Sequence, residues 1–190
     1  MITQNLETFG TLCAGIHQAA KHEPNDPKVM AAYDCLKVNL MLQYLALPVA
    51  CIFTDQNPYK DSTELRTRVP AEGVLFVYSG GDLPGDHPLA EFIPERAINW
   101  NCIFRAVHDY IGHISGNNSF SYVGECRAFL AHAKTLPALA HGALAAETIA
   151  QNSWFNFGPY KHTPANERPF ADQKAYVFPA SIHTEVFKYV

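Results

Sequence analysis

The stretch from Arg105 to Trp154 constrains this chain most, because it sets ionisable residues inside otherwise apolar helical patterns. On the helical period of about 3.6 residues, each of three consecutive predicted helices carries a polar pair on one face. The pairs are Asp109 with His113, Glu125 with His132, and Glu147 with Gln151. Burying such side chains is costly unless they are paired or bind a metal. We therefore expect the three helices to enclose a polar cleft.

Apolar periodicity and capping residues predict the helices along the chain. Asp26 before Pro27 is a strong helix start, Asn99 is an N-cap candidate, and Gly116 is a C-cap candidate. Helices are predicted over residues 3–22, 27–45, 61–68, 99–116, 121–134 and 137–152, with two short elements over 171–176 and 181–189.

Two apolar runs, 49–53 and 73–78, are typical of β-strands. Asp61 begins a capping-box pattern between them, so a short helix should connect the two strands. Strand, helix and strand in this order predict a parallel pair. Since a sheet of two strands is marginal, we expect a third strand from 175–178.

Together these elements predict an α+β fold that is predominantly helical, with a three-helix core and a small sheet of two or three strands. A chain of 190 residues suits a single domain, 1–190. Its predicted parts are a helical N-terminus (1–46), a strand-helix-strand unit (47–80), a helical core with the polar site (99–153) and an aromatic C-terminal wrap (154–190).

Composition excludes several protein classes. With 48% hydrophobic and 17% charged residues the chain should be globular, and a net charge of -4 argues against non-specific nucleic-acid binding. We expect no membrane span and no signal peptide. The five scattered cysteines indicate reduced thiols in a cytoplasmic setting. The oligomeric state has no signature in the sequence.

A metal site is the first hypothesis for the polar cleft, because imidazole and carboxylate are the usual ligands of zinc, manganese and iron. The four preferred ligands are His113, Glu125, His132 and Glu147. Asp109 would act as a further ligand or as a partner of one. The H-x4-H spacing in HDYIGH differs from the HExxH and Glu-x-x-His metal motifs.

The catalytic candidates are His108, Asp109 and Gln151, with His108 or Asp109 handling protons. A metal-free acid–base site is the alternative, in which a carboxylate orients a neighbouring imidazole. The acidic residue and imidazole at Asp86 and His87 lie in a turn-rich segment and could supply such a site from a loop, or be simple surface residues.

A purely structural interpretation stands beside these hypotheses. Arg105, Asp109 and His113 follow one another at i+4 and could form an ion-pair ladder on a solvated helix face. The other polar residues could form a hydrogen-bonded network that fixes helix packing. Gly112 would then only allow two helices to approach closely.

Several motifs, spread over roughly residues 28–178, give the chain a resemblance to a known domain. They are DHPL at Asp86, FRAVHDYIGH at Phe104, GE at Gly124 with Ala131-His132, ETIAQNSWFNFGP at Glu147, and ADQK at Ala171. In this combination the chain resembles an uncharacterised domain of bacteriophage and mobile-element proteins, often a module of large polyvalent polypeptides.

The resemblance implies a phage or mobile-element origin but supplies no activity. The polar positions it implies are Asp86, His87, His108, Asp109, His113, Glu125, His132, Glu147, Gln151, Asn152 and Gln173. The His-Asp dipeptide at His108 also suggests HD phosphohydrolases, although no further His and Asp of that pattern stand out.

Two functions follow as hypotheses. The first is a metal-dependent hydrolase of a phosphoester or related bond in a small-molecule substrate, located in the host cytoplasm or associated with the virion. The second is a non-enzymatic phage structural or host-interaction protein in which the polar set is a packing network. An inhibitor of a host protein would leave no signature in these residues.

Overall fold

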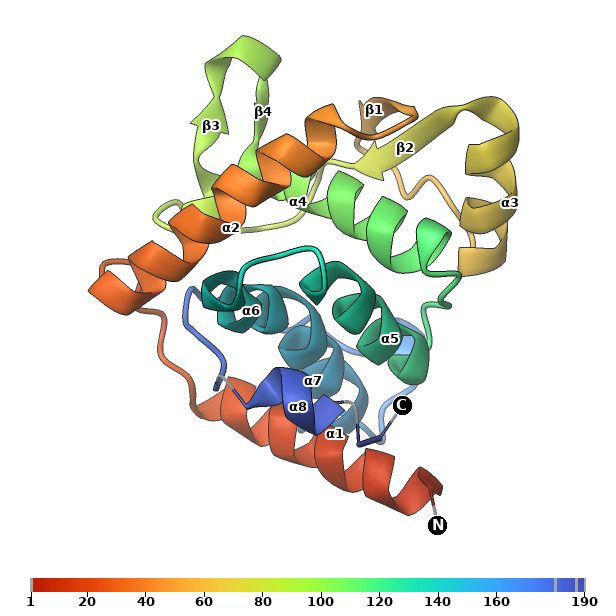
Figure 1. Ribbon diagram of the computed structural model, residues 1–190. Helices are drawn as coiled ribbons and strands as arrows, with labels where there is room; N and C mark the ends of the chain where they lie inside the picture. Colours follow the sequence, from red (N-terminus) through yellow and green to blue (C-terminus); the bar gives the residue numbers. More distant parts are fainter. Residues whose placement is uncertain (1, 180, 187, 190) are drawn as a thin grey trace.

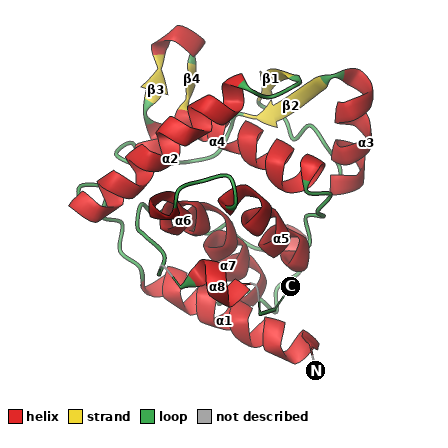
Figure 2. Cartoon of the chain, viewed as in Figure 1, coloured by secondary structure: helices red, strands yellow, loops and turns green. Residues whose placement is uncertain are grey.

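The computed structural model describes residues 2–179, 181–186 and 188–189 (Figure 1). Its fold is α+β and predominantly helical, as predicted (Figure 2). The helices are α1 (Ile2–Ala19), α2 (Pro27–Leu45), α3 (Ser62–Glu72), α4 (Trp100–His108), α5 (Tyr122–Ala133), α6 (Ala138–Ala145), α7 (Gln151–Phe157) and α8 (Ile182–Val186). Short 3-10 turns lie at Pro88–Ala90, Pro94–Arg96 and Ala165–Glu167.

Two of these helices continue into wider π-helical segments. Helix α4 continues into η3 (Asp109–Ser115), and α6 continues through η4 (Ala146–Ala150) into α7. A π-helix pairs residues i and i+5, so it rotates the residues after it onto a different face. Both segments fall in the region that the sequence marks as polar.

Helices α5, α6 and α7 form the centre of the molecule (Figure 1). Helix α2 packs on α6 and α4 along one side, and α1 packs on α7 along the opposite side, where α8 also lies. The apolar residues between these layers are buried, among them Leu36, Leu40, Phe129 and Leu144. Two of the three predicted core helices, 121–134 and 137–152, therefore lie inside the fold, covered on both sides, and the predicted helix 99–116 corresponds to α4 and the segment after it.

The predicted capping residues begin their helices. Asp26 accepts hydrogen bonds from the backbone N–H of Lys28 and Val29, and Asn99 accepts one from Cys102. Ser121 caps α5 in the same way. These bonds satisfy N–H groups that have no partner within the helix, which explains why local sequence alone located the helix starts.

The predicted parallel strand pair is confirmed. Strand β1 (Ala50–Thr54) pairs in parallel with β2 (Val74–Tyr78), and α3 forms the crossover between them. Leu65 and Val69 of α3 pack with Leu75 and Val77 of β2 in a small separate core. This unit lies at one end of the molecule, on the far side of α4 from the central helices (Figure 1).

The predicted third strand is wrong. The 175–178 segment runs without regular structure, and its backbone is bonded elsewhere: Ala175 O accepts from Glu23 N, and Ala175 N donates to the His22 ring. Because these backbone groups are already bonded to a loop and to a side chain, they are not available to pair with a strand. A separate antiparallel pair, β3 (Phe92–Ile93) with β4 (Ile98–Asn99), was not predicted.

The C-terminal third differs in detail from the prediction. The third core helix extends to Phe157, so part of the aromatic segment is helical rather than loop. The 171–176 stretch forms no regular element, and of the predicted 181–189 element the structure has α8, with residue 187 outside the described part. None of the helices in the described residues is long and apolar enough to cross a membrane.

Candidate metal centre

Three side chains from η3 and its neighbours converge in the core: His108, His113 and Glu125. Their ligand atoms all lie within 4.8 Å of one another. Nε2 of His108 is 3.7 Å from Glu125 Oε2, and Nε2 of His113 is 3.6 Å from Glu125 Oε1. Ligands about 2.1 Å from one tetrahedral ion lie roughly 3.4 Å apart, so the spacing is close to that of a metal site.

The π-helix η3 brings the two histidines together. His108 and His113 are five residues apart, and their ring centroids lie 5.2 Å from each other. An α-helix would have paired Asp109 with His113 instead, as the sequence period suggested. Asp109 is half-buried, and its carboxylate has no hydrogen bond or ion pair within the described part of the chain. Burial raises its pKa, against the pull of His113 and His108.

A close contact between η3 and α5 sets the distance between the histidines and Glu125. A Cβ at Gly112 would lie 3.0 Å from Ala128 Cβ and 3.3 Å from the His108 ring, so only glycine fits without displacing one of them. The Asn118 amide donates to Gly112 O at 2.8 Å and closes the end of the π-helix. The helices thus meet closely enough for their side chains to share one point.

Hydrogen bonding fixes which nitrogen of His113 carries its proton. Nδ1 lies 3.3 Å from the backbone carbonyl oxygen of Asn118, which can only accept. Nδ1 is therefore the N–H donor of the neutral ring, and Nε2 presents its lone pair to Glu125. This is the arrangement of a metal-binding histidine, whose second nitrogen donates to a carbonyl or carboxylate.

A longer chain of bonds fixes the proton of His108. Thr135 Oγ1 donates to His132 O (2.7 Å), so it must accept from Gln43 Nε2 (2.8 Å). Gln43 Oε1 then faces His132 Nε2 (3.2 Å) and accepts its proton. His132 Nδ1 is left as an acceptor for His108 Nδ1 (3.3 Å). The lone pair of His108 Nε2 consequently points toward Glu125.

The result is a buried site with more lone pairs than protons. Two imidazole lone pairs and a carboxylate face one point, and His108 Nε2 has no hydrogen-bond partner among the described residues. An orphaned buried nitrogen of this kind needs a proton or a cation. The residues present therefore fit a bound divalent metal, and a proton shared with Glu125 is the competing state.

The pKa shifts at the site describe the competing state, in which a proton lies between an imidazole and Glu125. Burial would raise the pKa of Glu125, but His108 and His113 outweigh it and hold that pKa at about 2. Burial lowers the pKa of His113, and the nearby Glu125 reverses this, so that the pKa is raised. Burial, aided by His108, lowers the pKa of His132 well below its usual range. His132 is thus held neutral, as its hydrogen bonds require.

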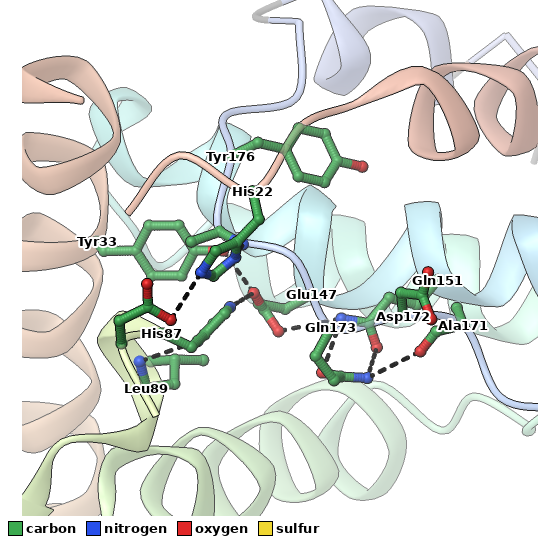
Figure 3. Close-up of polar contacts among 12 residues, drawn as sticks. His22, Tyr33, His87, Leu89, Glu147, Gln151, Ala171, Asp172, Gln173 and Tyr176 are labelled. Atoms are coloured by element: carbon green, nitrogen blue, oxygen red, sulfur yellow. Dashed lines mark hydrogen bonds and ion pairs between the residues drawn. The ribbon is translucent and has the colours of Figure 1, made fainter. Parts of the chain in front are cut away.

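Glu147 lies in a different group of buried residues, formed around the second π-helix, η4 (Figure 3). Tyr33 OH donates to Glu147 Oε1 at 2.5 Å, and Gln151 Nε2 donates to Oε2 at 3.1 Å. His87 Nε2 lies 3.2 Å from Oε1 but without the alignment of a hydrogen bond. Leu89 N donates to His87 Nδ1, so the proton of the neutral His87 ring is on Nε2 and faces the carboxylate.

The predicted site residues thus divide between two groups. His108, His113 and Glu125 meet at the candidate metal centre, and His132 reaches it only through His108. Glu147 and Gln151 meet in the second group, with their predicted i+4 contact present. The ladder of Arg105, Asp109 and His113 does not form, since Arg105 donates to backbone carbonyls of Tyr78 and Gly80.

Several residues that complete these groups carried no signal in the sequence. Tyr33 and Gln43 lie on α2, far along the chain, and look like ordinary helix positions. Asn118 lies in a turn, where asparagine is common for local reasons. His87 was singled out with Asp86, and the structure buries it completely.

The residues near the candidate metal centre can bind a divalent ion through two nitrogens and a carboxylate. Such a set leaves coordination positions open for a reactant. Comparison of the chain with protein-family models, curated proteins and solved structures gives no match.

Proposed function

We propose that this protein is a metal-dependent hydrolase of a phosphoester or related bond, with a zinc, manganese or iron ion held by His108 Nε2, His113 Nε2 and Glu125. The observation that carries the proposal is the pair of imidazole lone pairs facing a carboxylate, with no proton assigned between them. His108 takes the place in the ligand set that the sequence suggested for His132, and Glu147 lies outside it.

Two His and one carboxylate are a ligand set of catalytic zinc and non-haem iron sites. An ion there would lower the pKa of a bound water and polarise a phosphoryl oxygen. The residues of the chain hold and orient this set: Asn118 and His132 fix the two rings through their Nδ1 atoms. Because the protein has a net charge of -4, an anionic substrate would need the local positive charge of the ion.

Reactants would approach along Glu125, whose side chain is 15% exposed, whereas that of His113 is 2% exposed. The half-exposed ring of Phe120 packs edge-on against His113 at 4.9 Å and borders this approach. An apolar rim beside an open coordination position excludes bulk water, which strengthens the electrostatic effect of the ion.

Metal analysis of the untagged protein tests the proposal. Elemental analysis by inductively coupled plasma mass spectrometry should find near-stoichiometric zinc, manganese or iron in the wild type and in Glu147→Gln, and little in Glu125→Gln or His113→Ala. Glu147→Gln is the matched control, because it makes the same chemical change in the other buried group. Hydrolysis of p-nitrophenyl phosphate and its diester should then require the ion and disappear in Glu125→Gln.

The same experiment separates the non-enzymatic alternative. A wild type that folds without metal, and whose Glu125→Gln and Glu147→Gln variants are destabilised to a similar degree, would overturn the hydrolase proposal. It would favour a phage structural or host-interaction protein in which both groups serve packing. The hydrogen bonds to both oxygens of Glu147 are the observation that makes this second function worth testing.

A further inference from the structure

A cleft of about 1200 Å³ lies away from the candidate metal centre, and none of the three ligands lines it. One wall is formed by Tyr78 at the end of β2 and by the loops that follow β1 and β2, including Asp55 and Asp82. Because β1 and β2 are parallel, both of these loops lie at the same edge of the sheet. Ligands of parallel α/β units bind outside the carboxyl ends of the strands, so this is the expected side for a binding site.

The opposite wall comes from α4, α7 and the extended segment before α8. Gln151 and Gln173 bond reciprocally, with Nε2 to Oε1 distances of 3.2 Å and 3.0 Å (Figure 3). Gln151 uses its second N–H on Glu147, and Gln173 directs its second N–H to Ala171 O. Both N–H groups of each amide are therefore already donating. What each side chain has left for a ligand in the cleft is the second lone pair of its Oε1.

Asn101 supplies an independent sign of a ligand. It lines the cleft from α4, its residue is only 7% exposed, and its amide has no hydrogen-bond partner in the described part of the chain. Among the described residues, the buried polar atoms without a partner do not include those of Asn101, so its amide reaches the open space of the cleft with two donors and an acceptor free for a ligand. It is placed to bond whatever occupies the cleft.

Charge and ring positions narrow the ligand class. The described lining residues include three carboxylates, Asp55, Asp82 and Asp172, and one guanidinium, Arg105, which already donates to two backbone carbonyls. An acceptor-rich, acidic wall repels phosphate and favours a ligand rich in O–H donors. Phe170 lines the cleft and is 86% exposed as a residue. One face of its ring stacks on Phe155, with the centroids 6.0 Å apart, and the other face is an apolar surface on which an aliphatic ring can rest.

We infer that this cleft binds a neutral polyhydroxylated ligand, a saccharide, through Asn101, the Gln151–Gln173 pair and the Phe170 ring. Hydroxyl groups match the free lone pairs of the two glutamines and the aspartates, and they can also accept from Asn101. The C–H face of a sugar ring would cover Phe170. The inference does not depend on the metal centre.

Calorimetric titration with maltotriose, cellotriose and N-acetylchitotriose, in the presence of EDTA, tests the inference. The chelator separates this result from any outcome of the metal proposal. At least one trisaccharide should bind the wild type, and Asn101→Ala and Phe170→Ala should each weaken binding about tenfold or more. Phe92→Ala is the matched control, since Phe92 is 59% exposed and does not line the cleft.

Three results would overturn the inference. They are no binding of any trisaccharide, tighter binding of spermidine or glucose 6-phosphate than of every trisaccharide, and trisaccharide binding that is unchanged in Phe170→Ala. Because Phe170 is exposed, its variant should fold normally, so the test does not rest on the buried Asn101 alone.

Discussion

The two buried groups both pair imidazole with a buried carboxylate, and they differ in where their protons lie. Each joins histidine to glutamate in the core, and each is built beside a π-helical segment. Around Glu147, donors approach both oxygens: the Tyr33 hydroxyl, the Gln151 amide and the His87 N–H. Around Glu125, both imidazoles present lone pairs.

This difference shows that residue identity alone does not make a metal site. The two histidines beside Glu125 each have an acceptor at Nδ1, Asn118 O for His113 and His132 Nδ1 for His108, so Nδ1 carries the proton. His87 instead has a donor at Nδ1, Leu89 N, so its proton is on Nε2. An acceptor behind the ring leaves a lone pair in front of it, and a donor behind the ring leaves a proton in front. The outer hydrogen bonds therefore decide which carboxylate needs a cation.

The largest expected effect is stabilisation by the metal. Binding to the folded state alone adds about 4 kcal/mol when free ion is about 1,000 times the dissociation constant. Thermal unfolding with zinc and with EDTA should show this difference in the wild type and in Glu147→Gln, but not in Glu125→Gln. Equal stabilisation by zinc in Glu125→Gln and Glu147→Gln would contradict the proposed difference between the two buried groups.

Tyr33→Phe tests the second group. It removes a donor from buried Glu147 without opening a cavity, so the free energy of unfolding should fall by about 1–3 kcal/mol. Urea unfolding measures the loss, and the metal content should stay at the wild-type level. Tyr160→Phe removes the same hydroxyl from a half-exposed position and should cost less than about 0.5 kcal/mol. Loss of metal in Tyr33→Phe would show that the two groups are coupled.

Gln43→Ala tests the hydrogen-bond chain that orients His108. It removes the acceptor of the His132 proton, so His132 can change tautomer and offer its Nδ1–H to His108. Metal affinity should fall about tenfold, in the range found for outer partners of metal ligands. Competition with a chromophoric zinc chelator measures the affinity, and ¹⁵N NMR reports the His132 tautomer.

The control for this variant is Asn39→Ala on the same helix, because the Asn39 amide bonds only to Cys35 of its own helix. It should bind metal as the wild type does. If the metal affinity and the His132 tautomer are both unchanged in Gln43→Ala, the hydrogen bonds from Gln43 through His132 do not orient His108.

The smallest expected effect is a loss of stability at acidic pH, caused by buried His17 near Glu147. Burial, with the charge of Lys174, lowers the pKa of His17 below its ordinary 6.5, and the ring accepts from Tyr176 and donates to Asp172 O as a neutral base. The unfolded chain then binds a proton more readily, so stability is lost as the pH falls below about 6.5 toward the folded pKa.

The loss should not exceed about 1.4 kcal/mol for each pH unit in that window. Urea titrations in EDTA at several pH values measure it without interference from metal release. His17→Gln should reduce the slope but not abolish it, because the pKa of buried His132 is lowered as well, and the exposed variant His162→Gln is the control. A slope in His17→Gln equal to that of the wild type would assign the proton uptake to groups other than His17.

Local sequence was enough to predict most of the helices and the parallel strand pair, because caps and apolar periodicity act over a few residues. It also predicted that the faces of Glu125 and His132, and of Glu147 and Gln151, would be polar. It misjudged the pairing of Asp109 with His113, since the π-helix has no marker as clear as a proline or a cap. It also predicted a strand at 175–178, whose backbone bonds depend on distant loops.

The sequence by itself determined the helical α+β class, the main helix starts and the presence of buried histidines and carboxylates. Only the tertiary structure decided that these residues form two groups and not one, because the groups draw on Tyr33, Gln43 and His87 from distant parts of the chain. The physical reason is that burial and capping are local preferences, whereas the position of a proton depends on every donor and acceptor that folding brings near it.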